Sequence, residues 1–143
     1  MKKVEIFTDG GCSPNPGPGA WAALLRCAGK EREISGHVTE TTNNRMELSA
    51  SLEALRALSQ SCEVVLYTDS QYLKNGMTQW LAGWKKRGWR TAAGKAVLNQ
   101  DLWEALALEA SRHTVVWQWV RGHCGHAENE RVDALVKARR EQG

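Results

Sequence analysis

The sequence predicts a mixed α/β fold, in which a five-stranded sheet carries helices on both faces. Three observations lead to this prediction: β-rich apolar runs open the chain, leucines at helical spacing follow, and apolar runs then alternate with helical patterns. The 143 residues have the size of one domain. A chain of this length buries about two-thirds of its unfolded surface, so we expect a single domain with its own core over residues 1–143.

Three strands are expected first. Residues 4–8 form a short β-rich run, and the Gly/Pro-rich segment that follows, DGGCSPNPGPG, is not expected to continue a strand or a helix. Residues 21–27 and 33–38 flank a turn around Gly29, which is typical of a hairpin.

The first helix is expected at residues 41–60, where four leucines recur on one face. Asn44 and Glu47 resemble a capping box at its start. The rest of the chain is expected to contain, in order, a strand at 64–68, tryptophan-rich basic helices, a helix at 99–112, a strand at 114–120 and a helix at 128–140.

The charge is unevenly distributed, although the net charge is only +3. Between Ser70 and Gln100 there is no Asp or Glu, whereas this segment holds six basic residues: Lys74, Lys85, Lys86, Arg87, Arg90 and Lys95. The remaining residues are slightly acidic. Such a basic segment on a slightly acidic body indicates a polyanionic partner.

The amino terminus has too few apolar residues for a signal sequence, and no run approaches eighteen apolar residues. These features predict a cytoplasmic protein without a membrane partner. The four cysteines, at positions 12, 27, 62 and 124, fit no CxxC spacing, so reduced thiols are expected rather than a disulfide framework.

Two of the predicted strands end in the same Thr-Asp pair, at Asp9 and at Asp69. Side chains alternate along a strand, so each carboxylate shares a face with the aromatic residue two positions before it. If the strands are parallel neighbours, the carboxylates lie roughly 5 Å apart at the carboxyl edge of the sheet, where open α/β sheets bind ligands. The alternative is that each Asp is a turn former or a helix N-cap, which two matched copies disfavour.

Two further acidic residues could join this pair. Glu47 lies at the edge of the buried face of its helix rather than with the solvated charges, although capping the helix start could be its only role. Asp133 borders the apolar positions of the last helix, where a solvated surface acid is an equally good interpretation.

Carboxylates that are crowded together repel one another, so a site with four of them needs cations. Oxygen ligands select hard ions such as Mg²⁺ or Mn²⁺ over zinc. Two such ions about 4 Å apart are the usual device for phosphodiester hydrolysis. Together with the basic segment, this arrangement predicts a metal-dependent nuclease.

The sequence resembles bacterial ribonuclease H of type 1 over essentially the whole chain. The segments that carry the resemblance are IFTDGGCSPNPGPG, TTNNRMEL, TDSQY, WKKRGW, DLW and GHCGHAENERVD. The resemblance implies a sheet whose first three strands are antiparallel and whose first, fourth and fifth strands are parallel. It implies that the catalytic, metal-binding carboxylates are Asp9, Glu47, Asp69 and Asp133, with two Mg²⁺ ions when substrate is bound and Mn²⁺ as a substitute. The implied reaction is endonucleolytic cleavage of the RNA strand of an RNA/DNA hybrid, leaving 5′-phosphate and 3′-hydroxyl ends.

His123 matches the catalytic histidine of that family, which assists proton transfer or product release. An imidazole that titrates near neutrality suits this task. The alternative is a zinc site formed by His123, Cys124 and His126, which is disfavoured because no fourth ligand is evident.

The resemblance also assigns the substrate contacts. Short polar side chains would read the 2′-hydroxyls of the hybrid in its minor groove: Cys12, Asn15, Asn43, Asn44 and Gln71. A basic helical protrusion at residues 76–96 would grip the DNA strand through Trp80, Trp84, Lys85, Lys86, Arg87, Trp89 and Arg90. Packing is the alternative role for Trp80 and Trp84, whereas Trp103, Trp117 and Trp119 are interpreted as core.

Two other classes of function stay open: a module that binds hybrid or double-stranded RNA without catalysis, and a different enzyme of the same fold that acts on DNA. The four carboxylates argue against a pure binding module, because acids beside a polyanion weaken binding. The glycine-rich segment matches no nucleotide-binding motif, so no nucleotide cofactor is expected. A monomer is expected.

Overall fold

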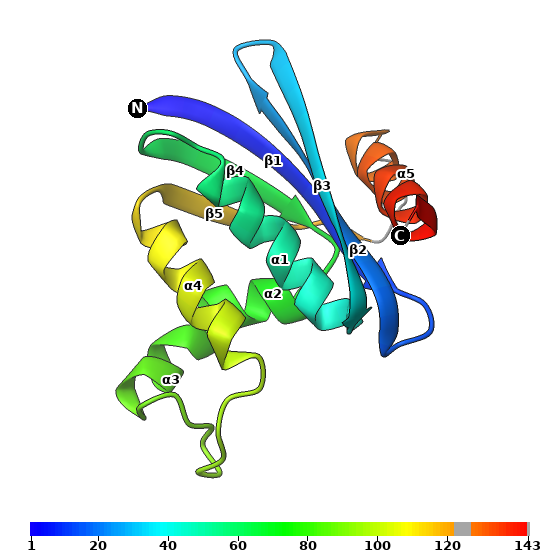
Figure 1. Cartoon of the computed structure of the whole chain (residues 1–143). Coiled ribbons are helices and arrows are strands. Elements are labelled where there is room, and N and C mark those ends of the chain that lie inside the picture. The colour runs from blue at the N-terminus through cyan, green and yellow to red at the C-terminus, as the bar shows by residue number, and fades with distance from the viewer. Residues whose placement is uncertain (122–126, 143) are drawn as a thin grey trace.

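A five-stranded sheet runs through the molecule in the order β3-β2-β1-β4-β5 (Figure 1). Its strands are β1 (Lys2–Cys12), β2 (Gly17–Cys27), β3 (Lys30–Thr41), β4 (Cys62–Thr68) and β5 (Thr114–Trp119). The first three strands pair antiparallel, whereas β4 pairs parallel with both β1 and β5. This computed structural model describes residues 1–121 and 127–142. The strand directions confirm the predicted mixed sheet.

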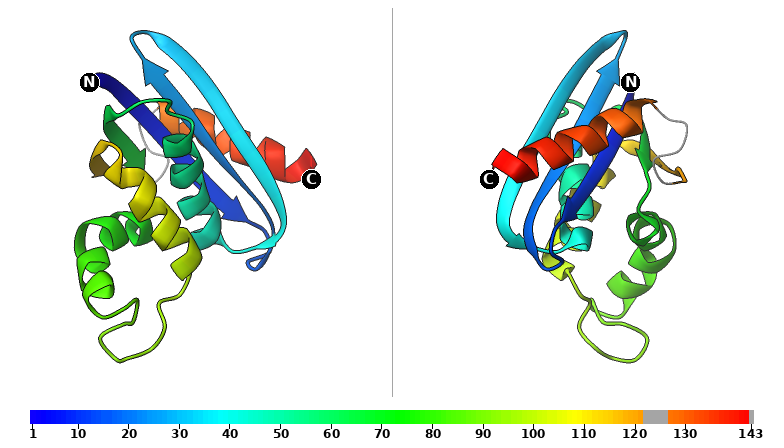
Figure 2. Two further views of the ribbon diagram at one scale, coloured as in Figure 1. Left: turned by 60° about the vertical axis from the view of Figure 1, so that its left-hand side comes forward. Right: turned by 90° about the vertical axis from the view of Figure 1, so that its right-hand side faces the viewer.

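Helices cover both faces of the sheet (Figure 2). On one face lie α1 (Asn43–Arg56) and α4 (Gln100–Ser111), and on the other lies α5 (Ala127–Gln142). Between β4 and α4 the chain forms α2 (Gln71–Asn75), the π-helical turn η1 (Gly76–Trp80) and α3 (Leu81–Lys86). Within the described residues, no helix combines the length and the apolar character needed to cross a membrane.

The alternation of side chains along the strands divides the apolar residues between two cores. Ile6 of β1 packs with the leucines of α1 and with Trp103 of α4. The side chains of Ile6 and Trp103 are fully buried. Phe7 points to the opposite face and packs with Val132 of α5. Consecutive residues of β1 therefore pack against helices on opposite faces of the sheet. This determines toward which face each later side chain of β1 points.

The prediction that the Gly/Pro-rich segment does not continue a strand is wrong for its two ends. β1 runs on through Gly10 and Gly11 to Cys12, and β2 begins at Gly17. A side chain at Gly10 would overlap the backbone of Met46 and Glu47 in α1. The glycine in the strand therefore marks a close approach of two backbones.

The predicted capping box is also wrong. The N-cap of α1 is Thr42, whose side chain accepts a hydrogen bond from the backbone N–H of Arg45 at 3.2 Å. Asn44 is the second residue of the helix and is exposed. Glu47 is therefore free of the capping role that the sequence allowed it, and its side chain is directed elsewhere.

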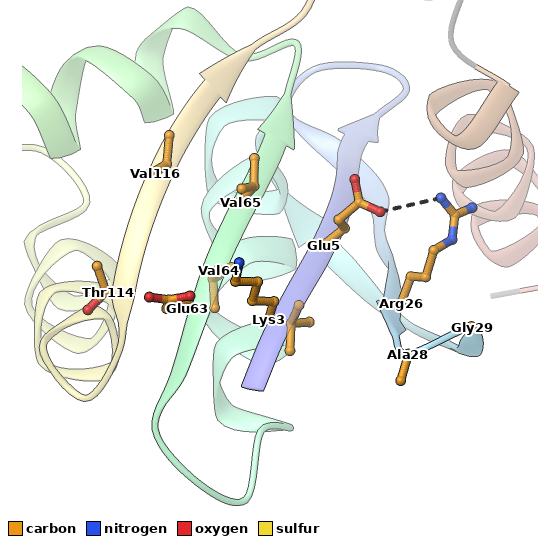
Figure 3. A pocket seen from close by; sticks show the side chains of 11 residues that line it. Lys3, Glu5, Arg26, Ala28, Gly29, Glu63, Val64, Val65, Thr114 and Val116 are labelled. Atoms are coloured by element: carbon orange, nitrogen blue, oxygen red, sulfur yellow. Dashed lines mark ion pairs between the residues drawn. The ribbon is translucent and has the colours of Figure 1, made fainter. Parts of the chain in front are cut away.

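A cavity of about 610 Å³ opens on the α5 side of the sheet, at the amino-terminal ends of β1, β4 and β5 (Figure 3). Val65 and Val116 form part of its apolar wall, and Glu5 and Arg26 form a charged pair at its rim, 3.6 Å apart. Asp9 and Asp69 lie toward the other ends of these strands. This cavity is therefore separate from the carboxylates that the sequence singled out.

Candidate active site

Three carboxylates meet at the carboxyl edge of the sheet. Asp9 lies in β1, Asp69 follows the last residue of β4, and Glu47 lies in the second turn of α1. One oxygen from each of the three lies within 4.8 Å of one another. The predicted approach of Asp9 and Asp69 is confirmed, because β1 and β4 are parallel neighbours that pair as far as Phe7 and Tyr67.

Glu47 reaches the sheet because α1 lies close to β1 at Gly10. The backbone N–H of Gly10 donates to Glu47 Oε1 at 3.0 Å. The other carboxylate oxygen, Oε2, is buried with no N–H or O–H donor from the described residues. The signal in the sequence for this contact was the glycine directly after Asp9, because only a residue without a side chain allows the helix backbone so near.

Burial and crowding make these carboxylates difficult to ionise. Burial, followed by the negative charge of Asp69, raises the pKa of Asp9 from 3.8 to about 7. Burial, followed by the charge of Asp9, raises the pKa of Glu47 well above 4.5. Two carboxyl groups in this position need either a shared proton or a cation between them. An all-oxygen set of this kind fits a hard divalent cation.

Asp133 approaches the same place from the opposite face of the sheet. It lies on α5, and both its charge and a side-chain hydrogen bond contribute to raising the pKa of Asp9. It also pairs with Lys137 one turn later on the helix, with Nζ 3.2 Å from Oδ2. Asp133 therefore borders the group of three carboxylates without belonging to it in this structure.

Of the five polar residues expected to read the substrate, Cys12, Asn15 and Asn43 form one hydrogen-bond network beside α1. Asn43 Oδ1 accepts from the backbone N–H of Cys12 at 2.7 Å, and Asn15 Oδ1 accepts from the backbone N–H of Asn43 at 3.3 Å. The Cys12 side chain is buried and its thiol donates to Asn15. Cys12 therefore supports the two asparagines, and its own side chain offers little surface to a partner. Gln71, the first residue of α2, is exposed.

The asparagines also line a second cavity, of about 470 Å³, to which Leu98 and Asn99 contribute from the far end of the basic segment. Asn99 has a left-handed backbone conformation with φ +61°, and its side chain accepts from Arg45 and donates to Tyr72 Oη. The sequence gave no reason to select Leu98 or Asn99, because their proximity to the asparagines arises from the packing of α4 on α1.

The aromatic residues of the basic segment form a cluster. Trp84 packs against Trp80, Trp89 and Trp103, with ring centroids 5.2–6.4 Å apart. Trp80 also contacts Tyr72 and keeps 38% of its surface exposed. Packing therefore accounts for much of Trp84, whereas Trp80 retains a face that could contact a partner.

The basic side chains of this segment differ in what they contact. Lys85, Lys86, Arg87 and Arg90 are all exposed. However, Arg87 Nε donates to the carbonyl of Arg90 at 3.1 Å, and Arg90 Nη1 donates to the carbonyl of Gly94 at 3.1 Å. Both arginines therefore also stabilise the loop, and contact of the four basic side chains with the DNA strand stays a prediction.

The remaining predicted positions have mixed outcomes. Trp103 is fully buried, as predicted. Trp117 and Trp119 are only half-buried, and the indole of Trp119 donates to the backbone carbonyl of Asp69 at 3.1 Å. His123 and its neighbours in the proposed zinc alternative, Cys124 and His126, lie outside the described residues.

Comparisons with known proteins agree with one another. A family model described as RNase H matches residues 1–141. A curated protein named Ribonuclease H from Acidithiobacillus ferrooxidans is 63% identical over 135 residues, which are 94% of this chain and 85% of that protein. One of the same name from Hydrogenovibrio crunogenus is 60% identical over 136 residues, or 95% of this chain and 94% of that protein.

Solved structures show the same similarity. LC9-RNase H1, described as a type 1 RNase H with the type 2 active-site motif, superimposes with a TM-score of 0.88 at 33% identity, covering 99% of this chain and 74% of that one. LC11-RNase H1, solved in complex with an RNA/DNA hybrid, has a TM-score of 0.71 at 22% identity and covers 97% of both chains. At that identity the second similarity concerns the fold alone.

Proposed function

The chain belongs to the ribonuclease H family, whose members are nuclease hydrolases, and on this premise we propose that it cleaves the RNA strand of RNA/DNA hybrids as an endonuclease. The observation that carries this proposal is the meeting of Asp9, Glu47 and Asp69, from three different elements, within 4.8 Å at one edge of the sheet. A cluster of carboxylates repels a polyanion unless cations lie between the carboxylates and the phosphates, so the cluster is better explained as a metal site than as a binding surface.

The metal-binding residues in this proposal are Asp9, Glu47, Asp69 and, from the opposite face, Asp133. They would hold two Mg²⁺ ions when substrate is bound, with Mn²⁺ as a substitute. Such ions would activate the attacking water and stabilise the leaving oxygen, and the products would carry 5′-phosphate and 3′-hydroxyl ends. The contribution of the chain is to hold the carboxylates in place: Gly10 N–H fixes one oxygen of Glu47, and burial removes competing water.

Substrate recognition is assigned to two surfaces of one catalytic domain that spans the chain. Asn15, Asn43, Asn44 and Gln71 present amides to the 2′-hydroxyls of the RNA strand, with Cys12 as their support. The protrusion at residues 76–96 contacts the DNA strand through its basic and aromatic side chains. The chain acts as a monomer in this proposal.

His123 assists proton transfer or product release in the proposed reaction. We expect His123→Ala to slow turnover without abolishing it, because general acid–base assistance is worth about 10² to 10⁴ while the cations stabilise most of the developing charge. Single-turnover and steady-state rates of His123→Ala and Asp69→Asn, measured side by side, check this, because product release affects only the steady-state rate. A His123→Ala protein as inactive as Asp69→Asn would contradict the auxiliary role.

One experiment separates the candidate functions. Labelled RNA/DNA hybrid, double-stranded RNA and double-stranded DNA are incubated with the protein in Mg²⁺ or in EDTA, and the products are resolved on a denaturing gel. Cleavage of only the RNA strand of the hybrid, and only with Mg²⁺, is expected. Asp69→Asn should bind hybrid without cleaving it. Binding without cleavage by the unaltered protein would favour a binding module, and cleavage of DNA would favour a different enzyme of this fold.

A further inference from the structure

The backbone around Asp69 lies beyond the last residue pair between β1 and β4, but next to the last residue pair between β4 and β5. The β1–β4 ladder ends with Phe7 and Tyr67, whereas the β4–β5 ladder continues to Thr68 and Trp119. The backbone N–H of Val120 then donates to the carbonyl of Thr68 at 2.8 Å. Support for the backbone at Asp69 therefore comes from the β5 side of the sheet.

Hydrogen bonds hold the peptide units on both sides of the Asp69 Cα atom. The preceding peptide is held through the Thr68 carbonyl by Val120. The following peptide is held at its carbonyl by the indole N–H of Trp119, at 3.1 Å, and at its N–H, which belongs to Ser70, by Thr68 Oγ1 at 3.0 Å. Because two fixed peptides determine φ and ψ between them, these contacts set the direction of the Asp69 Cα–Cβ bond, from which the carboxylate extends.

We propose that Trp119 is a positioning residue for the carboxylate cluster, acting through the backbone carbonyl of Asp69. This inference rests on the proposed function, in which the cluster holds divalent cations. Mg²⁺ demands oxygen ligands at nearly fixed distances, and a working site tolerates displacements of only about 0.5 Å. The charge of Asp69 is repelled by Asp9 and Glu47, so without a cation the backbone must resist that repulsion.

Trp117 provides a matched control. It lies two residues earlier on β5, so it shares the face of the strand, and it is half-buried against the larger core. Both side chains are half-buried, and replacing either by phenylalanine removes the same ring atoms. Only Trp119→Phe also removes the hydrogen bond to Asp69. A third variant, Trp119→His, retains a ring nitrogen at the position of the indole Nε1.

The experiment is a calorimetric titration with Mn²⁺ alone, without nucleic acid, at pH 8, accompanied by thermal unfolding of each variant. Trp119→Phe is expected to bind Mn²⁺ about three- to tenfold more weakly than the unaltered protein, which corresponds to the loss of one hydrogen bond. Trp117→Phe is expected to bind as the unaltered protein does, with a comparable fall in thermal midpoint. Trp119→His is expected to recover most of the affinity.

Equal Mn²⁺ affinities of Trp119→Phe and Trp117→Phe would overturn the inference, because packing alone would then explain the result. A Trp119→His protein that binds as weakly as Trp119→Phe would overturn it as well. Asp69→Asn distinguishes this failure from that of the proposed function: if Asp69→Asn binds Mn²⁺ as tightly as the unaltered protein, the carboxylate cluster is not the metal site at all.

Discussion

Asp9 couples the stability of the metal-free protein to pH. Its carboxyl has a pKa of about 7 in the folded protein, against an ordinary value of 3.8. Between these pH values the folded state retains a proton that the unfolded state has released, so stability falls as the pH rises through this window. Above the folded pKa the full repulsion among the three carboxylates is present, unless a cation binds.

We therefore expect Asp9→Asn to raise the thermal midpoint of the metal-free protein at pH 8, by roughly 3–8 °C, while abolishing hydrolysis. At pH 5 the rise in thermal midpoint should be smaller, because the pH has then passed through only the lower part of the window between 3.8 and about 7. Calorimetric unfolding in EDTA at both pH values measures this.

Glu63→Gln, at an exposed position in β4, controls for the change in charge. It should show no such dependence on pH. If Asp9→Asn destabilised the metal-free protein equally at pH 5 and pH 8, Asp9 would have a structural role that outweighs the repulsion. Adding Mg²⁺ at pH 8 should stabilise the unaltered protein more than Asp9→Asn.

At the scale of elements, α5 is held to the sheet by charged side chains as well as by its apolar face. Arg26 of β2 lies at the centre of this network: its guanidinium is 2.9 Å from Glu31 of β3, 3.2 Å from Glu128 of α5 and 3.6 Å from Glu5 of β1. It also lies over the ring of Phe7, 5.4 Å from the centroid. One side chain therefore joins four elements.

We expect Arg26→Met to lower the thermal midpoint more than Arg56→Met does. Methionine retains the apolar stem over Phe7 and removes the charge. Among residues 1–121 and 127–142, Arg56 pairs only within α1, with Glu53 at 3.3 Å, so its replacement breaks no ion pair between elements. Because exposed ion pairs are screened by salt, the difference between the two variants should shrink in 1 M NaCl.

Thermal unfolding at low and high salt measures both effects. Equal midpoints for Arg26→Met and Arg56→Met at low salt would mean that the ion pairs of Arg26 add nothing to the docking of α5.

At the scale of the whole molecule, the carboxylate cluster and the basic segment lie in different regions. The carboxylate cluster lies at the edge of the sheet, and the basic segment projects from below α4 (Figure 1). A polyanion bound to both must therefore extend from the site to α3. Lys85 and Lys86 lie at the last turn of α3, and both are exposed.

We expect the double substitution Lys85→Ala, Lys86→Ala to reduce the salt dependence of hybrid binding by roughly one to two units of slope. Each phosphate contact releases condensed counterions and contributes about 0.7 to 0.9 to that slope. Arg87 is left unchanged because its replacement would also remove the hydrogen bond to Arg90, so an effect on the fold of the loop could be mistaken for an effect on binding. Fluorescence anisotropy over a salt series, with Ca²⁺ replacing Mg²⁺ to suppress cleavage, measures the slope.

The matched control is Lys2→Ala, Lys30→Ala, which removes the same charge from two exposed positions on β1 and β3. Its slope should equal that of the unaltered protein. If both double variants changed the slope equally, the effect would arise from net charge, and the basic segment would have no special contact with phosphate.

The sequence by itself determined the strands and the shared face that Asp9 and Asp69 would present if their strands were parallel neighbours. Strand alternation is a local property of the backbone, so this conclusion needs only nearby residues. The family resemblance added the strand directions, Asp133 and the substrate contacts; the roles of Asp133 and of the substrate contacts stay predictions.

Only the tertiary structure decided the contacts on which the geometry of the site depends. The approach of α1 to Gly10 turns Glu47 from a capping candidate into a partner of Asp9. The end of β5 brings Trp119 to Asp69, fifty positions earlier in the chain. Each of these contacts joins residues far apart in sequence, and local propensity carries no information about which distant residue will supply the hydrogen-bond donor. The packing of the helices and strands against one another determines that residue.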